Sequence, residues 1–188
     1  MMLEKYASDL TQGAIETTYE AIDGAAGFAN ESFYNLVDGN DQSKWCSNAG
    51  DYWIVFRADE PIVPTYYRLV TGNDTGGNPD RNWKSWKVYG ANFADDDACD
   101  RDASDWVLLD EKKDIGRDQL PAANFATAFF YMSNPSATPY QYYKIEISDP
   151  TGLMQMGEFS FGNGANFILT RQEFYEGKEH SRQAFRGL

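Results

Sequence analysis

Short runs of apolar residues, separated by turns rich in Gly, Pro, Asn and Asp, are the main pattern along this chain. Residues 52–57 (YWIVFR) are almost continuously apolar, which is typical of a strand buried on both faces. Residues 142–148 (YYKIEIS) alternate, so that Tyr143, Ile145 and Ile147 point to one side of the expected strand and the polar residues to the other. Both patterns predict β-strands.

Eight strands are expected in total. They cover residues 14–20, 52–57, 66–71, 85–90, 106–109, 126–132, 142–148 and 154–161. With turn signals between them and no long amphipathic helix, these strands predict an all-β fold, an antiparallel jelly-roll β-sandwich.

The sandwich is expected to carry short helical or irregular appendages at both ends. The predicted boundaries are an N-terminal extension over residues 1–13, the sandwich over 14–165, and a C-terminal extension or linker over 166–188. Within the last segment, Thr170–Glu173 has the pattern of a helix capping box.

The composition fits this fold and limits the partners. The chain has 12 Tyr, 12 Phe and 5 Trp, residue types that pack well in strands. Its 29 acidic and 16 basic residues give a net charge of −13, which repels phosphates. We therefore expect no nucleic-acid partner and no binding to anionic membranes, whereas a neutral ligand or a cation fits.

The chain has no uninterrupted apolar run of about 18 residues, the length that spans a bilayer. Residues 1–6 (MMLEKY) lack the apolar region of a signal peptide. Two alternatives stay open: a cytosolic protein, or a domain of a longer secreted chain.

The residues that commonly carry catalysis are sparse. The sole histidine, His180, has no Ser or Cys nucleophile motif near it, and no phosphate-binding loop or HExxH motif is present. The sequence therefore predicts a protein that is not an enzyme. Cys46 and Cys99 match no zinc-binding spacing, and could form a disulfide or remain buried thiols.

Residues 35–45 (NLVDGNDQSKW) concentrate oxygen-bearing side chains in one tight turn. These are Asn35, Asp38, Asn40, Asp41 and Ser43. Calcium takes about six to eight oxygen ligands of these kinds. The alternative is that Asp-Gly-Asn serves only as turn chemistry, since all three residue types tolerate positive φ.

Four segments, taken in order, resemble a known family. They are 37–45 (VDGNDQSKW), 51–56 (DYWIVF), 71–90 (from TGND to KSWKVYG) and 142–159 (from YYKI to MQMGEF). Together they resemble the discoidin, or F5/8 type C, superfamily, and within it the galactose-binding-like sandwiches related to carbohydrate-binding module family 32. The resemblance covers residues 14 to about 162. The acidic stretch Asn92–Asp105 and the tail from Thr170 to Leu188 depart from the family pattern.

The resemblance implies a structural Ca²⁺ that joins the first long loop to the last strand. The implied ligands are the carbonyl of Asn35, the side chains of Asp38 and Asn40, the hydroxyl or carbonyl of Ser43, the carbonyl of Gly157 and the carboxylate of Glu158. Without an ion, Glu158 would cap a strand and hydrogen bonds alone would hold the loop.

A second acidic pattern is weaker. Asp100, Asp102, Ser104 and Glu111 mimic the spacing of an EF-hand loop, but Asp105 stands where that loop needs Gly. We expect a solvated acidic loop here.

The resemblance also implies a ligand site in loops at one end of the sandwich. The loop of residues 72–84 offers Asn73, Asp74, Arg81 and Trp83. Amide, carboxylate and guanidinium groups can bind adjacent sugar hydroxyls, and an aromatic ring can cover the C–H face of the sugar. The alternative is that Asp74 and Arg81 pair with each other and that Trp83 belongs to the core.

The expected function is therefore a non-catalytic glycan-binding module with a structural calcium ion. We expect it to belong to an extracellular or cell-surface bacterial protein, with neighbouring domains in the same chain. The alternative is a structural or protein-interaction domain of the same fold that has no sugar site.

Overall fold

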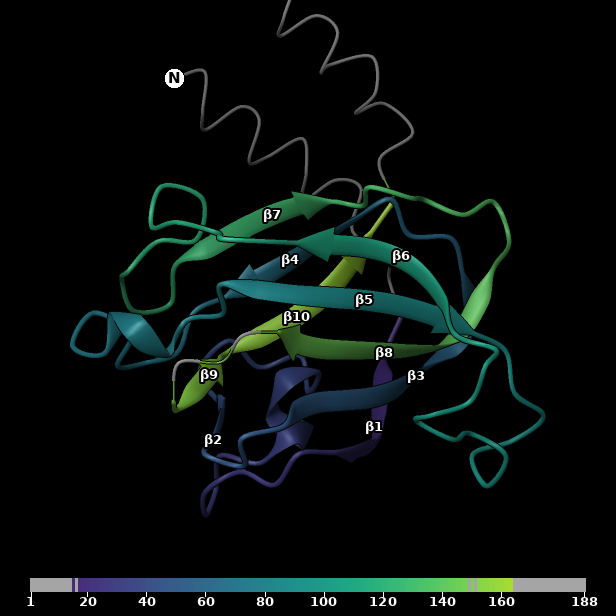
Figure 1. Ribbon diagram of the computed structural model, residues 1–188, viewed down its shortest axis with the longest axis horizontal. Helices are drawn as coiled ribbons and strands as arrows, with labels where there is room; N and C mark the ends of the chain where they lie inside the picture. The colour runs from purple at the N-terminus through teal and green to yellow at the C-terminus, as the bar shows by residue number, and fades with distance from the viewer. Residues whose placement is uncertain (1–14, 16, 149, 151, 164–188) are drawn as a thin grey trace, which may run out of the picture.

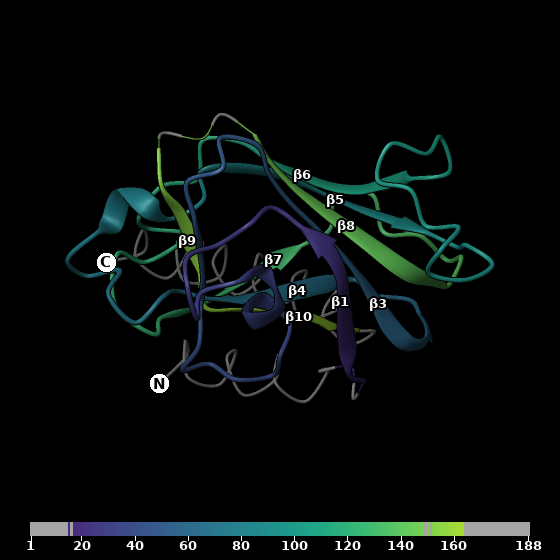
Figure 2. The same cartoon turned by 90° about the horizontal axis from the view of Figure 1, so that it is seen from below.

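The computed structural model describes residues 15, 17–148, 150 and 152–163. Within these residues, antiparallel strands form two facing sheets and a small two-stranded ribbon (Figures 1 and 2). The larger sheet has the order β1 (Tyr19–Gly24), β3 (Tyr52–Ile62), β8 (Tyr140–Ser148), β5 (Ser85–Ala91), β6 (Val107–Lys112). The smaller sheet has the order β10 (Glu158–Gly162), β4 (Tyr66–Val70), β7 (Thr127–Tyr131). The ribbon pairs β2 (Trp45–Ser47) with β9 (Met154–Met156), and two 3₁₀ turns are present, η1 (Phe33–Leu36) and η2 (Pro79–Arg81). The chain is an antiparallel β-sandwich, as predicted.

Aromatic side chains fill the space between the two sheets. Phe56 of β3 lies opposite Tyr143 of β8 in the register, and their rings stack with centroids 5.7 Å apart. From the facing sheet, Phe159 and Phe161 of β10 pack on Phe56 at 5.7 and 6.0 Å. All four side chains are buried. Because each ring removes a large apolar area from water, this cluster is a main source of sandwich stability.

A buried chain of hydrogen bonds also joins the sheets. Trp86 Nε1 of β5 donates to the hydroxyl of Tyr67 of β4 (2.7 Å), and that hydroxyl donates to Asp110 Oδ2 of β6 (2.6 Å). The other Asp110 oxygen accepts from Lys112 Nζ (2.6 Å) and from the amide and hydroxyl of Ser133 (2.9 and 2.7 Å). Asp110 is 0% exposed. Its charge is therefore stabilised by a full set of donors.

Replacing Asp110 is expected to destabilise the sandwich strongly. Asp110→Ala leaves Lys112 and the Tyr67 hydroxyl without their buried partner, so the free energy of unfolding should fall by about 3–5 kcal/mol. Tyr67→Phe removes a neutral link in the same chain and should cost about 1–3 kcal/mol. Urea unfolding of both variants measures the two losses. Equal, small losses would contradict the central role of Asp110.

The positions of most strands agree with the sequence pattern. The predicted strands at 52–57, 66–71, 85–90 and 142–148 correspond to β3, β4, β5 and β8. The first strand begins at Tyr19 and not at residue 14, and no local sequence pattern indicates β2. β2 is only three residues long, and pairing with β9 defines it.

The predicted strand 154–161 is two strands that meet at Gly157. β9 pairs with β2, whereas β10 pairs with β4, so the chain changes partners at this residue. The Gly157 amide donates to the carbonyl of Val70 (2.7 Å). A Cβ at Gly157 would lie 2.9 Å from the carbonyl oxygens of Val70 and Thr71. A glycine is therefore required for this close approach.

The predicted terminal segments 1–13 and 166–188 lie outside the described residues. The domain boundaries and the capping box at Thr170–Glu173 stay predictions. In the described part of the chain, no helix is long and apolar enough to cross a membrane.

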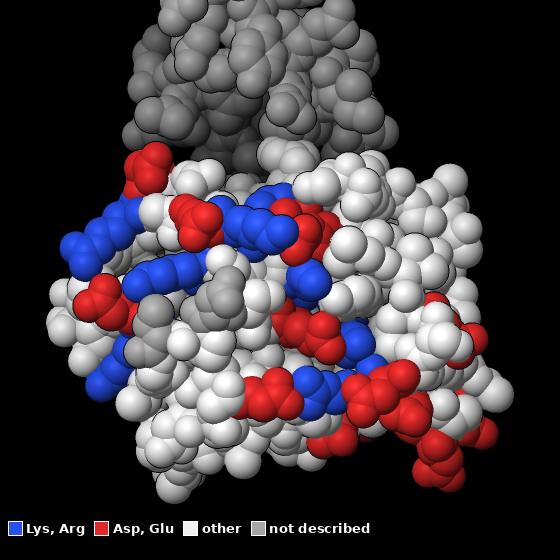
Figure 3. Space-filling view, viewed as in Figure 1, with Lys and Arg blue, Asp and Glu red and all other residues white. Residues whose placement is uncertain are grey.

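The acidic stretch Asn92–Asp105 covers the outer face of the larger sheet. Arg101 donates two hydrogen bonds to Asp51 (2.7 and 3.0 Å), and its guanidinium lies 4.4 Å from the ring centroid of Trp53. Lys144 of β8 donates to the Arg101 carbonyl at 2.9 Å and is buried. Figure 3 shows basic and acidic side chains interspersed on this face. The acidic side chains Asp100, Asp102 and Asp105 are exposed, as expected for a solvated acidic loop, while contacts of Arg101 attach the loop to the sheet.

The EF-hand pattern does not form a site. Glu111 lies on β6, where its carboxylate pairs with Lys87 (3.8 Å) and Lys113 (3.1 Å). In the same region Asp96 accepts two hydrogen bonds from Arg57, both 2.8 Å. These carboxylates are neutralised by protein cations.

Both cysteines are free thiols. Burial, followed by the charges of Asp96 and Asp100, raises the pKa of Cys99 to about 11. Burial and the nearby Glu31 raise the pKa of Cys46. Neither thiol is therefore activated as a nucleophile.

Candidate functional site

The turn at residues 35–45 folds around the hydroxyl of Ser43. Ser43 Oγ lies 2.9 and 3.1 Å from the two carboxylate oxygens of Asp38. It also lies 2.9 Å from the carbonyl oxygen of Asn40 and 3.4 Å from that of Asn35. Gly39, with φ of +73°, allows the chain to reverse between Asp38 and Asn40. Four of the six predicted calcium-binding residues therefore gather on this turn.

Some oxygens of this turn already accept hydrogen bonds. Asp38 Oδ1 accepts from the Asn40 amide (2.8 Å), and Asn40 Oδ1 accepts from the Gln42 amide (3.1 Å). The Asn35 side-chain amide donates to the carbonyls of Asn30 and Lys44, both at 2.9 Å. Asn35 therefore offers its carbonyl, and not its side chain, toward Ser43.

Glu158 joins this turn from the opposite end of the sequence. It begins β10, lies opposite Val70 of β4, and is 1% exposed. Burial, and next the charge of Asp38 and a hydrogen bond with it, raise the pKa of Glu158 to about 9. Glu158 Oε2 is buried and has no hydrogen-bond partner among the described residues. Two carboxyl groups in such contact need a proton or a cation between them.

An ion pair holds the turn against the smaller sheet beside this position. The guanidinium of Arg68 on β4 makes two hydrogen bonds to the Asp41 carboxylate (2.8 and 3.0 Å). Arg68 Nε also donates to Ser160 Oγ on β10 (3.1 Å). No local sequence pattern connects Asp41 to Arg68, which lies 27 residues away, so this ion pair could not be predicted from the sequence.

The donor set around Glu158 consists of oxygens. Among the described residues, no group of three or more His, Cys, Asp and Glu side chains could hold a metal ion. A cation between Asp38 and Glu158 would therefore need amide, hydroxyl and carbonyl oxygens to complete its shell. A hard cation such as Ca²⁺ accepts such a mixture, whereas Zn²⁺ favours nitrogen and sulfur.

The raised pKa of Glu158 predicts how the metal-free protein depends on pH. The unfolded chain releases this proton near pH 4.5, whereas the folded chain keeps it until about pH 9. Between these values the folded state binds more protons, so stability falls as pH rises, by at most about 1.4 kcal/mol per pH unit. In EDTA, the melting temperature should fall between pH 5 and 8. In Glu158→Gln this part of the slope should vanish, and an unchanged slope would contradict the assignment.

The predicted ligand-binding loop is held by ion pairs of its own. Asp74 Oδ1 accepts from Lys44 Nζ at 2.7 Å, and Asp74 Oδ2 accepts from Arg81 (3.2 Å) and Asn78 (3.2 Å). Burial alone would raise the pKa of Asp74, but the hydrogen bond and charge of Lys44 outweigh it and lower this pKa. Asp74 and Arg81 therefore pair with each other, which is the alternative to a purely ligand-binding role.

Lys44 connects this loop to the oxygen-rich turn. It is 5% exposed, and besides Asp74 it contacts Glu31 (3.3 Å) and Gln155 Oε1 (3.4 Å). It follows Ser43 directly in the chain. The sequence pattern gave no sign that this lysine would be buried, because its partners are distant in sequence.

Trp83 is not available to a ligand, which corrects the prediction of a stacking role. It is 0% exposed and packs edge-on against Trp45 (6.3 Å between centroids) and Trp86 (6.0 Å). Trp45 and Trp86 are themselves fully buried. Asn73 is exposed, and its side chain makes no hydrogen bond to another described residue.

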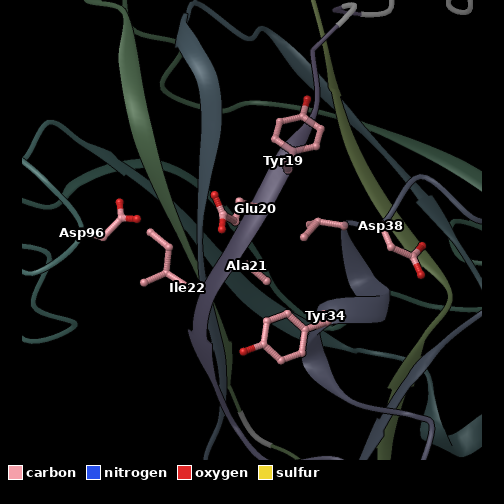
Figure 4. Close-up of a pocket in the computed structure, with 8 residues that line it drawn as sticks. Tyr19, Glu20, Ala21, Ile22, Tyr34, Asp38 and Asp96 are labelled. Atoms are coloured by element: carbon pink, nitrogen blue, oxygen red, sulfur yellow. The ribbon is translucent and has the colours of Figure 1, made fainter.

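A shallow pocket of about 500 Å³ lies beside β1, away from the loop (Figure 4). Tyr34 is its most exposed aromatic, and Glu20 and Asp96 contribute carboxylates. Both carboxylates are bound to Arg57, at 2.5 and 2.8 Å. Asp38 also borders the pocket, but in Figure 4 its carboxylate points away from β1.

Solved structures share this fold. The family 32 carbohydrate-binding module of Streptococcus pneumoniae EndoD is 15% identical, over 76% of this chain and 94% of that module, with a TM-score of 0.53. The family 32 module of C. perfringens NanJ, solved in complex with galactose, is 10% identical over 77% and 93%, with a TM-score of 0.52. Reduced XRCC1, in a structure with the DNA pol beta catalytic domain, is 11% identical over 79% and 99%, with a TM-score of 0.58.

These similarities define the class of fold. The protein has the discoidin-like, galactose-binding-like β-sandwich and resembles family 32 carbohydrate-binding modules in structure. The resemblance inferred from the sequence is confirmed at the level of the fold. No protein-family model matches the sequence, and the comparison with curated proteins gives no match.

Proposed function

We propose that this protein is a non-catalytic glycan-binding module stabilised by a calcium ion, and that it forms part of an extracellular bacterial protein with further domains. Its structural neighbours include modules solved with galactose and with GalNAc-β-1,3-galactose. These ligands belong to those proteins. For this chain they support a neutral sugar as the ligand class, which the net charge of −13 also favours.

The buried oxygen of Glu158 without a hydrogen-bond partner is the observation that carries the calcium proposal. A buried charged group is costly unless it is paired, and the charge that acts most strongly on Glu158 is that of the like-charged Asp38, followed by the opposing charge of Arg68. The residues that would hold the ion are Asn35, Asp38, Asn40, Ser43, Gly157 and Glu158. A bound Ca²⁺ would supply the positive charge that lets both carboxylates ionise together.

Calcium should therefore raise thermal stability. At a concentration about 100 times its dissociation constant, a ligand specific to the folded state adds about 2.7 kcal/mol, which corresponds to a rise of about 5–10 °C in melting temperature for a chain of this size. Differential scanning calorimetry at pH 7.5 in Ca²⁺ and in EDTA measures the shift. Equal midpoints in the two solutions would refute the proposed site.

Glu158→Gln is the matched control for this measurement. The amide keeps the size of the side chain and removes its charge, so the variant should melt at the same temperature with and without Ca²⁺. Asp59→Asn, a change on the exposed part of β3, should keep the full response to calcium. Loss of the response in both variants would indicate a nonspecific effect of charge.

The loop of residues 72–84 supports the glycan proposal. Asp74 and Arg81 are fixed by their mutual contact and remain partly exposed, and Asn73 presents an amide with both donor and acceptor groups. A preformed polar surface loses little conformational entropy when it binds a sugar. Trp83 contributes to this surface only by supporting the loop from below.

Asn73→Ala tests the loop as a sugar site. Because the Asn73 side chain makes no internal hydrogen bond, its removal should leave the melting temperature unchanged. Loss of one or two hydrogen bonds to a sugar should weaken binding by about tenfold. A glycan array that includes galactose and GalNAc-β-1,3-galactose, followed by calorimetric titration of the strongest binder, measures this effect. Unchanged affinity would place the site elsewhere.

A protein-interaction domain is the second candidate function. The similarity to XRCC1, solved in complex with a polymerase domain, supports it. The two functions differ in the array experiment: a folded, calcium-loaded protein that binds no glycan favours an interaction domain.

A further inference from the structure

A sugar site on this end of the sandwich needs an exposed aromatic ring, and Trp83 cannot supply it. Phe125, in the loop before β7, is 40% exposed. β5 and β7 both begin at the end of the sandwich where η2 lies, at the left of Figure 1. We propose that Phe125 is the platform on which the apolar face of a neutral pyranose stacks. This inference rests on the proposed glycan-binding function and names a residue of that site.

The backbone at Phe125 is held in an unfavourable conformation. Its φ of +53° lies in the left-handed region, which aromatic residues with a Cβ rarely adopt. Such a conformation costs free energy, and the surrounding structure must enforce it. An exposed Phe gains little from burial, so folding alone gives no reason to keep this residue where Gly or Asn would be relaxed.

Hydrogen bonds to the 71–77 segment enforce this conformation. The hydroxyl of Thr71 donates to the Ala123 carbonyl (2.5 Å) and accepts from the Ala126 amide (2.8 Å). Asn124 Oδ1 accepts from the Gly76 amide (2.7 Å). The two residues that flank Phe125 are thus fixed, which holds the backbone of Phe125 in place.

The same contacts place Phe125 beside the polar groups of the ligand loop. The Phe125 amide donates to the Gly72 carbonyl at 3.4 Å, and Asn73 is the next residue along the chain. Sugar rings present an apolar C–H face and a rim of hydroxyls, so they match an aromatic ring flanked by an amide. The net charge of −13 of the whole chain, and not the paired Asp74, is what disfavours anionic sugars here.

The pocket beside β1 is the competing position. Tyr34 there is 55% exposed, and its ring lies on that of Phe33 with centroids 4.4 Å apart. However, the pocket carboxylates Glu20 and Asp96 are occupied by Arg57. Asp74 and Arg81 at the loop end are paired as well, but that end also presents the exposed Asn73 amide, which makes no hydrogen bond to another described residue.

Phe125→Gly is the decisive variant, because Gly adopts a φ of +53° without strain and lacks the ring. Its melting temperature should stay the same or rise by about 2–4 °C, because the backbone strain is relieved. Its affinity should fall at least about tenfold for the array glycan that the unaltered protein binds most tightly, with galactose and GalNAc-β-1,3-galactose among the probes. Tyr34→Ala is the control, and should bind as the unaltered protein does.

The outcomes separate this inference from the proposed function. If the unaltered protein binds a glycan and Phe125→Gly binds it equally well, Phe125 is not the platform, whereas glycan binding stands. If Tyr34→Ala loses binding and Phe125→Gly keeps it, the site lies at the β1 pocket. If the calcium-loaded, unaltered protein binds no glycan on the array, both the function and the platform are overturned.

Discussion

The contact between Asp38 and Glu158 is the constraint on which the arrangement of the loops depends. One carboxylate comes from a turn early in the chain and the other from the start of β10. Burial of Glu158, and next the charge of the exposed Asp38, raise the pKa of Glu158, so this contact favours a neutral or cation-bound state over two bare charges. Around this pair, Gly157 changes the strand partners and Arg68 holds the turn to the smaller sheet. The contact between Asp38 and Glu158 joins residues more than one hundred positions apart in the sequence. Apolar packing alone would not align these two residues so specifically.

Much of the sandwich could be predicted because its strands are strongly patterned. The runs that became β3 and β8 show burial on both faces or clear alternation, and these signals depend only on local sequence. The sequence did not reveal β2, since three residues carry too little pattern, nor the break at Gly157, since the pattern of MQMGEFSF is compatible with one continuous strand. In both cases pairing with a distant strand decides the structure.

The oxygen-rich turn of residues 35–45 could be predicted from the sequence. The roles of the aromatic residues Trp83 and Phe125 could not. Asp38, Asn40 and Ser43 lie close in sequence, so their proximity in the turn followed directly. Whether a Trp is exposed depends on the facing sheet, which explains why Trp83 was assigned to a ligand although it contacts Trp45 and Trp86. Phe125 carries no sequence signal at all, because its backbone conformation arises from contacts with Thr71 and Gly76.

The buried ammonium group of Lys44 has a consequence for recognition kinetics. Both oxygens of Asp74 are already engaged, one by Lys44 and the other by Arg81 and Asn78. An incoming molecule that took Asp74 for itself would remove the shorter of the two ion pairs of a buried cation, leaving Lys44 with Glu31 alone. A ligand must therefore bind without breaking the ion pairs of this loop. Binding to such a rigid surface requires no slow conformational change. Selectivity among ligands that fit this surface would then arise mainly from differences in their dissociation rates.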